Sequence, residues 1–206
     1  MEGISDAVHL CIDMQNIFAK GGVWETPWME RVLPVIADIC ARYTERTVFT
    51  RFITPQQPQD RRGQWQAYFT KWQRATRGYL APGALDIVPK LARYSPPALV
   101  VDKPAYSAFF GSRLGHLLVE RHVGTLVVSG AETDVCVLST VLGAVDLGFR
   151  VIIVQDALCS SSDAGHDALM TMYRTRFHGQ IDLSALTNCS RCGLRTRCSA
   201  PSRRTA

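Results

Sequence analysis

Cys136 is the residue of this 206-residue sequence that is best placed to act as a nucleophile. It follows an apolar run at 125–128 and a turn that contains Gly130, and a helical pattern at 137–147 comes directly after it. A thiol in the first turn of a helix lies at the positive end of the helix dipole, which favours the nucleophilic thiolate. The unpaired backbone N–H groups of the same turn can hold a developing oxyanion. The pattern predicts covalent catalysis by a cysteine.

Asp13 and Lys103 are the candidates for the base and the charge partner that such a nucleophile needs. Each stands near the end of another apolar run, 7–14 for Asp13 and 98–101 for Lys103. A carboxylate in an apolar run is costly unless it is paired. The alternatives are structural, with Cys136 as an inert buried thiol, Asp13 as a loop cap and Lys103 as a solvated strand end. The three residues support one another only if the fold brings them together.

Short apolar runs alternate with helical patterns along the chain. We expect strands over 7–14, 47–51, 98–101, 125–128, 149–155 and 181–183. We expect helices from a cap at Thr26-Pro27 to near Cys40, through the aromatic residues Trp65, Phe69 and Trp72, over 110–122 and 137–147, and from a cap at Asp163 to about Arg174. This alternation is typical of an α/β fold, a three-layer α/β/α sandwich with a mostly parallel central sheet.

Functional sites of such sheets form beyond the carboxyl ends of the strands. Five candidate residues lie at or just beyond the predicted ends, namely Asp13, Arg51, Lys103, Cys136 and Asp156. We therefore expect one edge of the sheet to collect them.

The composition is that of a soluble globular protein, with 47% hydrophobic and 20% charged residues. We expect one domain over 1–184, with no membrane span and no targeting segment, and hence a cytoplasmic protein. The net charge of +5 comes from five arginines in a tail at 185–206, because the 18 remaining basic residues match the 18 acidic ones. A charge confined to a tail does not indicate nucleic-acid binding.

The cysteines divide between the body and the tail. Those of the body suit reduced, buried thiols, and the tail holds Cys189, Cys192 and Cys198. With His178 these three could form a zinc site, but a second ligand pair of the usual spacing is absent. We expect a basic, Cys- and Arg-rich tail that is disordered, and neither metal nor cofactor.

Several stretches resemble the isochorismatase-like cysteine hydrolase superfamily, which includes nicotinamidases, N-carbamoyl amidohydrolases and ureidoacrylate or biuret hydrolases. The resemblance spans roughly residues 7–180 in the right order. The matching stretches are Cys11-Ile12-Asp13-Met14-Gln15-Asn16 with Phe18, Lys103-Pro104-Ala105-Tyr106-Ser107-Ala108-Phe109, Gly130-Ala131-Glu132-Thr133-Asp134-Val135-Cys136-Val137, Ala144-Val145-Asp146-Leu147-Gly148 and Val154-Gln155-Asp156-Ala157.

The resemblance implies a catalytic triad of Asp13, Lys103 and Cys136. It also implies a cis peptide between Ala131 and Glu132, with the amides of Glu132 and Cys136 forming the oxyanion hole. Phe18, Tyr106 and Phe109 match pocket positions of the family, and Arg51, Trp24 and Trp65 are weaker candidates for binding the substrate. Relatives are often dimers or tetramers, so a homo-oligomer acting on a small molecule is expected.

Two differences from the family narrow the predicted reaction. The Asp-x-His metal motif of nicotinamidase-like members is missing from Thr50-Arg51-Phe52-Ile53-Thr54. Isochorismatases proper, which cleave a vinyl ether, lack the cysteine, so Cys136 favours hydrolysis of a C–N bond in an amide, carbamoyl or ureido group through a thioester. A catalytically silent or regulatory relative and a vinyl ether hydrolase are the alternatives. A nucleotide-binding protein and an esterase are disfavoured, because G-x-G-x-x-G, a P-loop and G-x-S-x-G are all absent.

Overall fold

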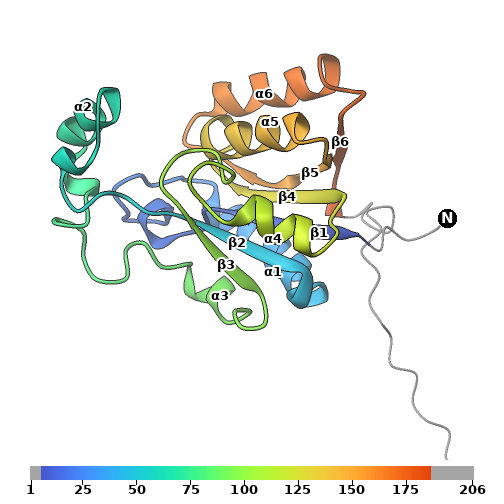
Figure 1. Cartoon of the computed structure of the whole chain (residues 1–206), viewed down its shortest axis with the longest axis horizontal. Helices are drawn as coiled ribbons and strands as arrows, with labels where there is room; N and C mark the ends of the chain where they lie inside the picture. The colour runs from blue at the N-terminus through green and yellow to red at the C-terminus, as the bar shows by residue number, and fades with distance from the viewer. Residues whose placement is uncertain (1–5, 187–206) are drawn as a thin grey trace, which may run out of the picture.

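Six parallel strands form one sheet in the computed structural model, which describes residues 6–186 (Figure 1). They are β1 (Ala7–Ile12), β2 (Thr47–Phe52), β3 (Leu99–Lys103), β4 (Thr125–Ala131), β5 (Arg150–Cys159) and β6 (Ile181–Ser184). Their order across the sheet is β3-β2-β1-β4-β5-β6, and every neighbouring pair is parallel. The central strands β1 and β4 are buried along their whole length, which explains why they read as continuous apolar runs. All six predicted strands are confirmed.

Helices cover both faces of the sheet and complete the predicted three-layer sandwich. The helices α1 (Met29–Arg42) and α3 (Pro89–Ala92) pack on one face. The other face is covered by α4 (Leu114–Glu120), α5 (Leu138–Asp146) and α6 (Asp163–Thr175). The helix α2 (Gln64–Lys71) lies in the long connection between β2 and β3 and stands to one side of the three layers (Figure 1).

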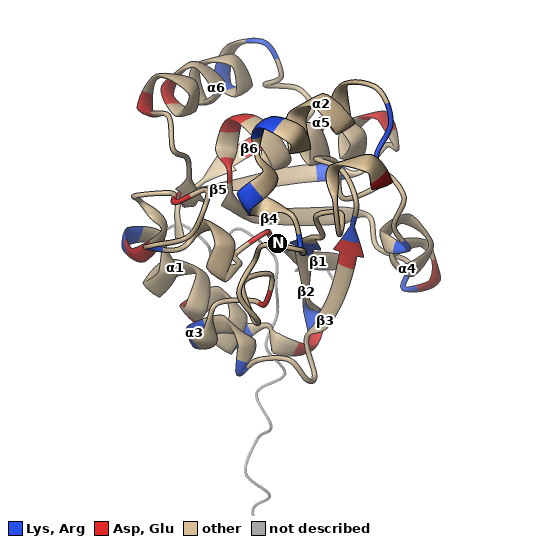
Figure 2. Cartoon of the chain, turned by 90° about the vertical axis from the view of Figure 1, so that its left-hand side faces the viewer, with Lys and Arg blue, Asp and Glu red and all other residues tan. Residues whose placement is uncertain are grey.

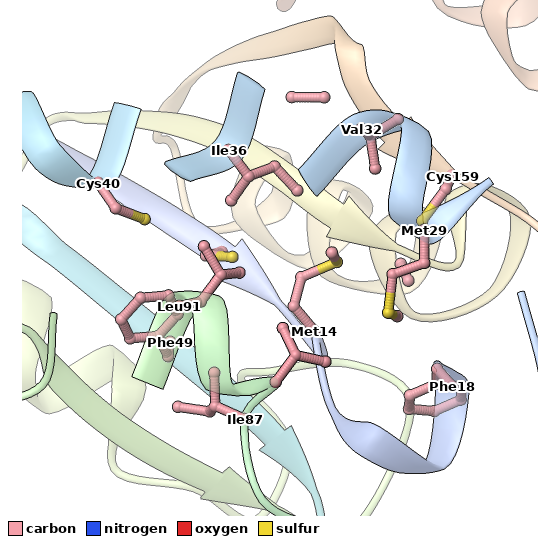
Figure 3. Close-up of a cluster of buried hydrophobic side chains, with 14 of the residues drawn as sticks. Met14, Phe18, Met29, Val32, Ile36, Cys40, Phe49, Ile87, Leu91 and Cys159 are labelled. Carbon is pink, nitrogen blue, oxygen red and sulfur yellow. The ribbon is translucent and has the colours of Figure 1, made fainter. Parts of the chain in front are cut away.

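The amphipathic pattern of α1 produces the core on its side of the sheet. Its residues Met29, Val32, Ile36 and Cys40 are buried and point toward the sheet, and Phe49 of β2 belongs to the same cluster (Figure 3). Burial of apolar side chains at this helical spacing stabilises the packing of α1 on the sheet.

Several predicted element ends were wrong. The helix α1 begins at Met29 and not after Thr26, because the Thr26 hydroxyl is directed at Trp24 O and a Glu132 carboxylate oxygen, both 3.5 Å away. Ser162, and not Asp163, caps α6, since its Oγ accepts the Gly165 N–H at 3.0 Å. The predicted helix at 110–122 is shorter, at Leu114–Glu120.

Acidic and basic residues are interspersed along the helices and loops around the sheet (Figure 2). Over the described residues no helix is long and apolar enough to cross a membrane. The predicted tail falls almost wholly outside the described residues, and with it the suggested zinc ligands Cys189, Cys192 and Cys198. The four described cysteines, Cys11, Cys40, Cys136 and Cys159, are all free thiols.

Candidate active site

The candidate site lies where the order of the strands changes direction along the chain. The chain runs from β1 outward to β3 on one side and then returns to β4 on the other side of β1. The carboxyl ends of two strands that diverge in this way leave a crevice in which ligands of open α/β sheets bind. Asp13 follows β1 and Cys136 follows β4, so both belong to this crevice.

Asp13 is held in one orientation by its neighbours on the sheet. Its backbone has a φ of 49°, in the left-handed region that aspartate tolerates better than most residues. Its Oδ1 accepts the Thr50 hydroxyl at 2.6 Å, and the Asp13 N–H donates to the same hydroxyl oxygen at 3.1 Å. Its Oδ2 lies 2.7 Å from Lys103 Nζ. Both charged side chains are fully buried. The sequence analysis expected a carboxylate in an apolar run to need a partner, and Lys103 is that partner.

Lys103 reaches Asp13 from the end of β3, two strands away. Its Nζ also donates to the carbonyl oxygens of Ala105 and Tyr106, each at 2.9 Å, in addition to its ion pair with Asp13. The ammonium lies 5.0 Å from the centre of the Phe52 ring. Burial alone lowers the pKa of Lys103, but the neighbouring Asp13 and Cys136 outweigh burial and raise it. The group therefore stays a cation.

The turn that carries Cys136 depends on Gly130. Gly130 pairs with Ile12 of β1 and has a φ of 115°, and a Cβ at this position would collide with the Ile12 backbone. After it the Ala131–Glu132 peptide is cis, and residues Thr133–Val137 form a π-helical turn before α5. The close approach of the two strands brings this turn beside Asp13.

Cys136 is 4% exposed and lies close enough to Asp13 and Lys103 for both charges to act on its thiol. Burial raises the pKa of this thiol, and the Asp13 carboxylate raises it further, while Lys103 acts in the opposite direction. The sequence predicted a thiolate favoured by the helix N-terminus. That expectation was wrong for the resting site, because burial and the nearby carboxylate outweigh the cation.

The backbone of this turn offers N–H groups near the sulfur. Val135 N and Val137 N both donate to Glu132 O, at 3.1 Å each. The amides of Glu132 and Cys136, the predicted oxyanion donors, belong to the same turn. The two predicted oxyanion donors therefore lie in one short segment.

A cavity of about 360 Å³ opens onto Cys136. Six of its twelve lining residues are aromatic, and the others are two valines, two glutamates, a serine and Cys136 itself. The lining residues are Phe18, Val23, Trp24, Glu25, Phe52, Tyr68, Trp72, Tyr106, Glu132, Val135, Cys136 and Ser161. Its volume lies within the range of small-molecule sites.

The structure brings Phe18, Tyr106 and Trp24 to this cavity but not the other predicted binding residues. Arg51 pairs with Asp102, its register partner on β3, through bonds of 2.7 and 2.9 Å, and with Asp86 at 3.3 Å. Phe109 stacks on Phe149 with the ring centres 6.0 Å apart, and it packs against the core under α4 and α5.

Two further sequence candidates also lie outside the cavity lining. Trp65 stands behind the wall, with its ring 4.8 Å from that of Tyr106. Asp156 binds the backbone N–H of Leu186 with both carboxylate oxygens. Each of these side chains has a structural partner that explains its orientation.

The sequence analysis missed several residues that the site uses. Thr50 orients Asp13, and Phe52, Tyr68 and Trp72 form part of the wall. Trp72 and its aromatic neighbours were recognised as a helix pattern, but nothing in the spacing indicated that they face Cys136. A signal existed for Phe52, because it directly follows the strand predicted at 47–51, and the other candidates also lie at or beyond the ends of predicted strands.

Among residues 6–186, no group of three or more His, Cys, Asp and Glu side chains is arranged to hold a metal ion.

Residues 7–185 match the family model described as "Isochorismatase domain". The chain is 29% identical over 185 residues to Nicotinamidase 3 of Arabidopsis thaliana, a match that covers 87% of this chain and 86% of that protein. It is 33% identical over 88 residues to an isochorismatase family protein of Bacillus subtilis, and there the match spans about half of that protein, 48%. It is 40% identical over 80 residues to a ureidoacrylate amidohydrolase of Azorhizobium caulinodans, covering 38% of this chain and 35% of the relative.

Solved structures show the same fold. An isochorismatase family protein from Desulfovibrio vulgaris superposes with a TM-score of 0.78 at 25% identity, covering 92% of this chain and 99% of the other. An N-carbamoylsarcosine amidase from Thermoplasma acidophilum superposes with a TM-score of 0.70 at 21% identity, covering 90% and 97%.

Proposed function

The chain belongs to the isochorismatase family of hydrolases, and within that family we propose that it is a cysteine-dependent amidohydrolase. It cleaves a non-peptide C–N bond in an amide, carbamoyl or ureido group of a small molecule. The observation that carries the proposal is the buried ion pair of Asp13 and Lys103, 2.7 Å apart, within reach of the Cys136 thiol at the end of a cavity. A buried charge pair beside a thiol supplies a base, a cation and a nucleophile in one place.

Acylation begins from the protonated thiol. The Asp13 carboxylate takes the Sγ proton while Sγ attacks the carbonyl carbon, and the carbonyl π electrons move to oxygen. The N–H groups of Glu132 and Cys136 bind the oxyanion. Asp13 then gives the proton to the leaving nitrogen as the C–N bond breaks. Ammonia or an amine departs and a thioester on Cys136 remains.

Deacylation uses the same groups. Asp13 takes a proton from a water molecule that attacks the thioester, and the second tetrahedral oxyanion occupies the same N–H groups. Its collapse breaks the C–S bond, releases the acid and returns the proton to Sγ. Lys103 keeps its charge throughout and balances the charge of the buried carboxylate.

The test is the release of ammonia from a panel of primary amides, ureas and carbamoyl compounds. We expect Cys136→Ala and Asp13→Asn to reduce kcat by at least about 10³-fold. Cys159→Ala is the matched control, because Cys159 is also a free, buried thiol but does not line the cavity. Intact-mass measurement should detect an acyl adduct on the active protein. If the panel yields neither ammonia nor an adduct, the alternative of a catalytically silent relative is favoured.

A further inference from the structure

The cavity has an acidic wall, as far as the described residues 6–186 form it. Among the described residues that line it, none is lysine, arginine or histidine, and two are glutamates, Glu25 and Glu132. Lys103 is not among the lining residues; it donates two hydrogen bonds to backbone carbonyl oxygens and is paired with the Asp13 carboxylate. Arg51 is held by Asp102 and Asp86.

Glu132 is the more enclosed of the two glutamates. Its Oε1 accepts the Ser161 N–H at 3.1 Å and lies 3.5 Å from the Thr26 hydroxyl. Glu132 forms no ion pair with a lysine, arginine or histidine of the part of the chain that the structure describes. A half-buried carboxylate without a cation is costly, and a cationic ligand would reduce that cost.

The Glu132 carboxylate acts electrostatically on two tyrosines of the cavity wall, Tyr68 and Tyr106. Burial is the main cause of the raised pKa of Tyr68 and of Tyr106, and the Glu132 carboxylate adds to both. The negative potential of this carboxylate therefore extends over the space that a ligand would occupy.

The aromatic rings of the wall favour the same kind of ligand. The Trp24 ring centre lies 5.8 Å from that of Phe18 and 6.1 Å from those of Tyr68 and Trp72. Such a group of rings accepts flat groups by stacking and cations by the attraction of the ring faces. Lys103, whose ammonium lies 5.0 Å from the Phe52 ring centre, already makes a contact of this kind behind the wall.

A ligand carboxylate would meet the opposite conditions. It would enter an enclosed site beside one or two carboxylates and would find no cation to pair with. Like charges at short range in an enclosed site are repulsive, and such repulsion is an effective way of rejecting a substrate.

From these observations we infer that the cavity selects amides or ureas whose non-reacting part is flat and positively charged, and that the Glu132 side chain is the specificity determinant that excludes carboxylate-bearing substrates. The inference rests on the proposed function for turnover, but it concerns binding and is tested separately from it.

The experiment compares three benzamides of similar size that differ in the charge of the para substituent: 4-(aminomethyl)benzamide, 4-(hydroxymethyl)benzamide and 4-carbamoylbenzoate. We expect kcat/KM to fall in the order cationic, neutral, anionic, with the cation favoured over the anion by about 100-fold or more, as expected for a partly buried charge pair. In Glu132→Gln the Oε1 acceptor for Ser161 is kept and the charge is removed. The ratio of kcat/KM for the cationic amide to kcat/KM for the neutral amide should then fall about tenfold, mainly because KM for the cationic amide rises. The control is Glu120→Gln on α4, whose exposed side chain lies away from the cavity.

Binding to Cys136→Ala protein, measured by calorimetry, separates this inference from the proposed function. If no benzamide is hydrolysed but the cationic amide binds more tightly than 4-carbamoylbenzoate, and the additional Glu132→Gln change removes that preference, the inference stands and the proposed function fails. The inference is overturned by an anion that is hydrolysed or bound best, by a preference that Glu132→Gln leaves unchanged, or by no binding of the cationic amide at millimolar concentration. If Glu132→Gln does not fold, the order of the three compounds on wild-type and Cys136→Ala protein decides.

Discussion

Asp13 acts on Cys136 in two opposite ways. As a proton acceptor it promotes attack by the sulfur, and as a neighbouring negative charge it raises the pKa of the thiol and so suppresses the free thiolate. A site of this kind forms the reactive thiolate only as the proton moves to the carboxylate. Reaction with a substrate that completes this proton transfer and reaction with a simple alkylating agent should therefore respond differently to the loss of the carboxylate.

We predict that Asp13→Asn abolishes turnover but accelerates alkylation of Cys136 by iodoacetamide at pH 7 by about tenfold. The neutral amide no longer disfavours the thiolate, and Lys103, now without its partner, lowers the pKa of the thiol. Peptide mass spectrometry measures the rate at Cys136 alone, with the other thiols as internal references. Slower alkylation in Asp13→Asn would contradict this view and would favour a preformed thiolate that depends on Asp13.

A second residue-scale prediction concerns His9, which is buried in β1 and bonded to Ser129 Oγ at 2.8 Å and Thr47 Oγ1 at 3.2 Å. Burial lowers the pKa of His9 from 6.5 to about 3. Between these values the unfolded chain binds a proton that the folded protein does not. The contribution of His9 to the free energy of unfolding is therefore fully present above pH 6.5. Below that pH it decreases by about 1.4 kcal/mol per pH unit.

Urea unfolding between pH 4 and 7 measures that dependence. His9→Gln should be less stable at pH 7 but should lose less stability on acidification than the wild type. The exposed His116 on α4 provides the control, because His116→Gln should keep the wild-type slope. If the unfolding free energy of His9→Gln depends on pH as steeply as that of the wild type, His9 is not the cause of the dependence.

The three residues proposed for catalysis could be found from the sequence because each follows an apolar run that becomes a strand. The pairing of Lys103 with Asp13 could not, since it depends on a side chain crossing β2 to reach β1. The position of Arg51 outside the cavity lining has a similar origin. Its partner Asp102 is adjacent only once β2 and β3 pair in their register.

At the scale of the element, the turn between β4 and α5 was the segment whose structure the sequence predicted least well. The strand and the helix were predicted, but the π-helical turn Thr133–Val137 has no periodicity of its own. Ends of elements were missed for a related reason: the Thr26 hydroxyl turned to a residue far away in the sequence. Tertiary contacts of this kind leave no local signal.

Gly130 is the residue on which this turn depends most, and we predict that Gly130→Ala destabilises the protein by roughly 2–4 kcal/mol. Its φ of 115° and the nearby Ile12 backbone leave no room for a methyl group. Gly115→Ala in α4 should have the opposite sign, with a gain of about 0.5–1 kcal/mol, because nothing lies within 4 Å of the added carbon. Thermal and urea unfolding of both variants measure the difference. A Gly130→Ala protein as stable as the wild type would show that the turn can be rebuilt.

For the whole molecule, the order of the strands explains where the candidate site forms. The sheet places the ends of β1 and β4 side by side at its point of divergence, and the long connection that carries α2 adds Tyr68 and Trp72 to the aromatic wall. The sequence predicted the layers and the edge of the sheet at which the site lies. The sequence did not predict the aromatic wall, because the residue pattern of the connection that carries α2 does not indicate where this connection lies relative to the sheet edge.

The body and the tail of the chain should be separable. Every described residue of the cavity lies before position 162, and the family model ends at residue 185. We predict that a chain ending at Leu186 keeps its thermal stability and its kcat/KM within about twofold, while loss of the five tail arginines lowers the isoelectric point from about 8.9 toward neutrality. Thermal unfolding, isoelectric focusing and the amidase assay check this. A marked loss of activity would show that the tail contributes to the site.

The aromatic wall has one more consequence, which is optical. Two of the four tryptophans of the chain, Trp24 and Trp72, line the cavity, and Trp65 lies directly behind Tyr106. Indole emission changes in intensity and wavelength when the polarity of its surroundings changes. The protein therefore carries its own fluorophores at the place where a ligand would enter. Occupancy of the cavity can be followed by intrinsic fluorescence in real time, on unlabelled protein and with compounds that are never turned over.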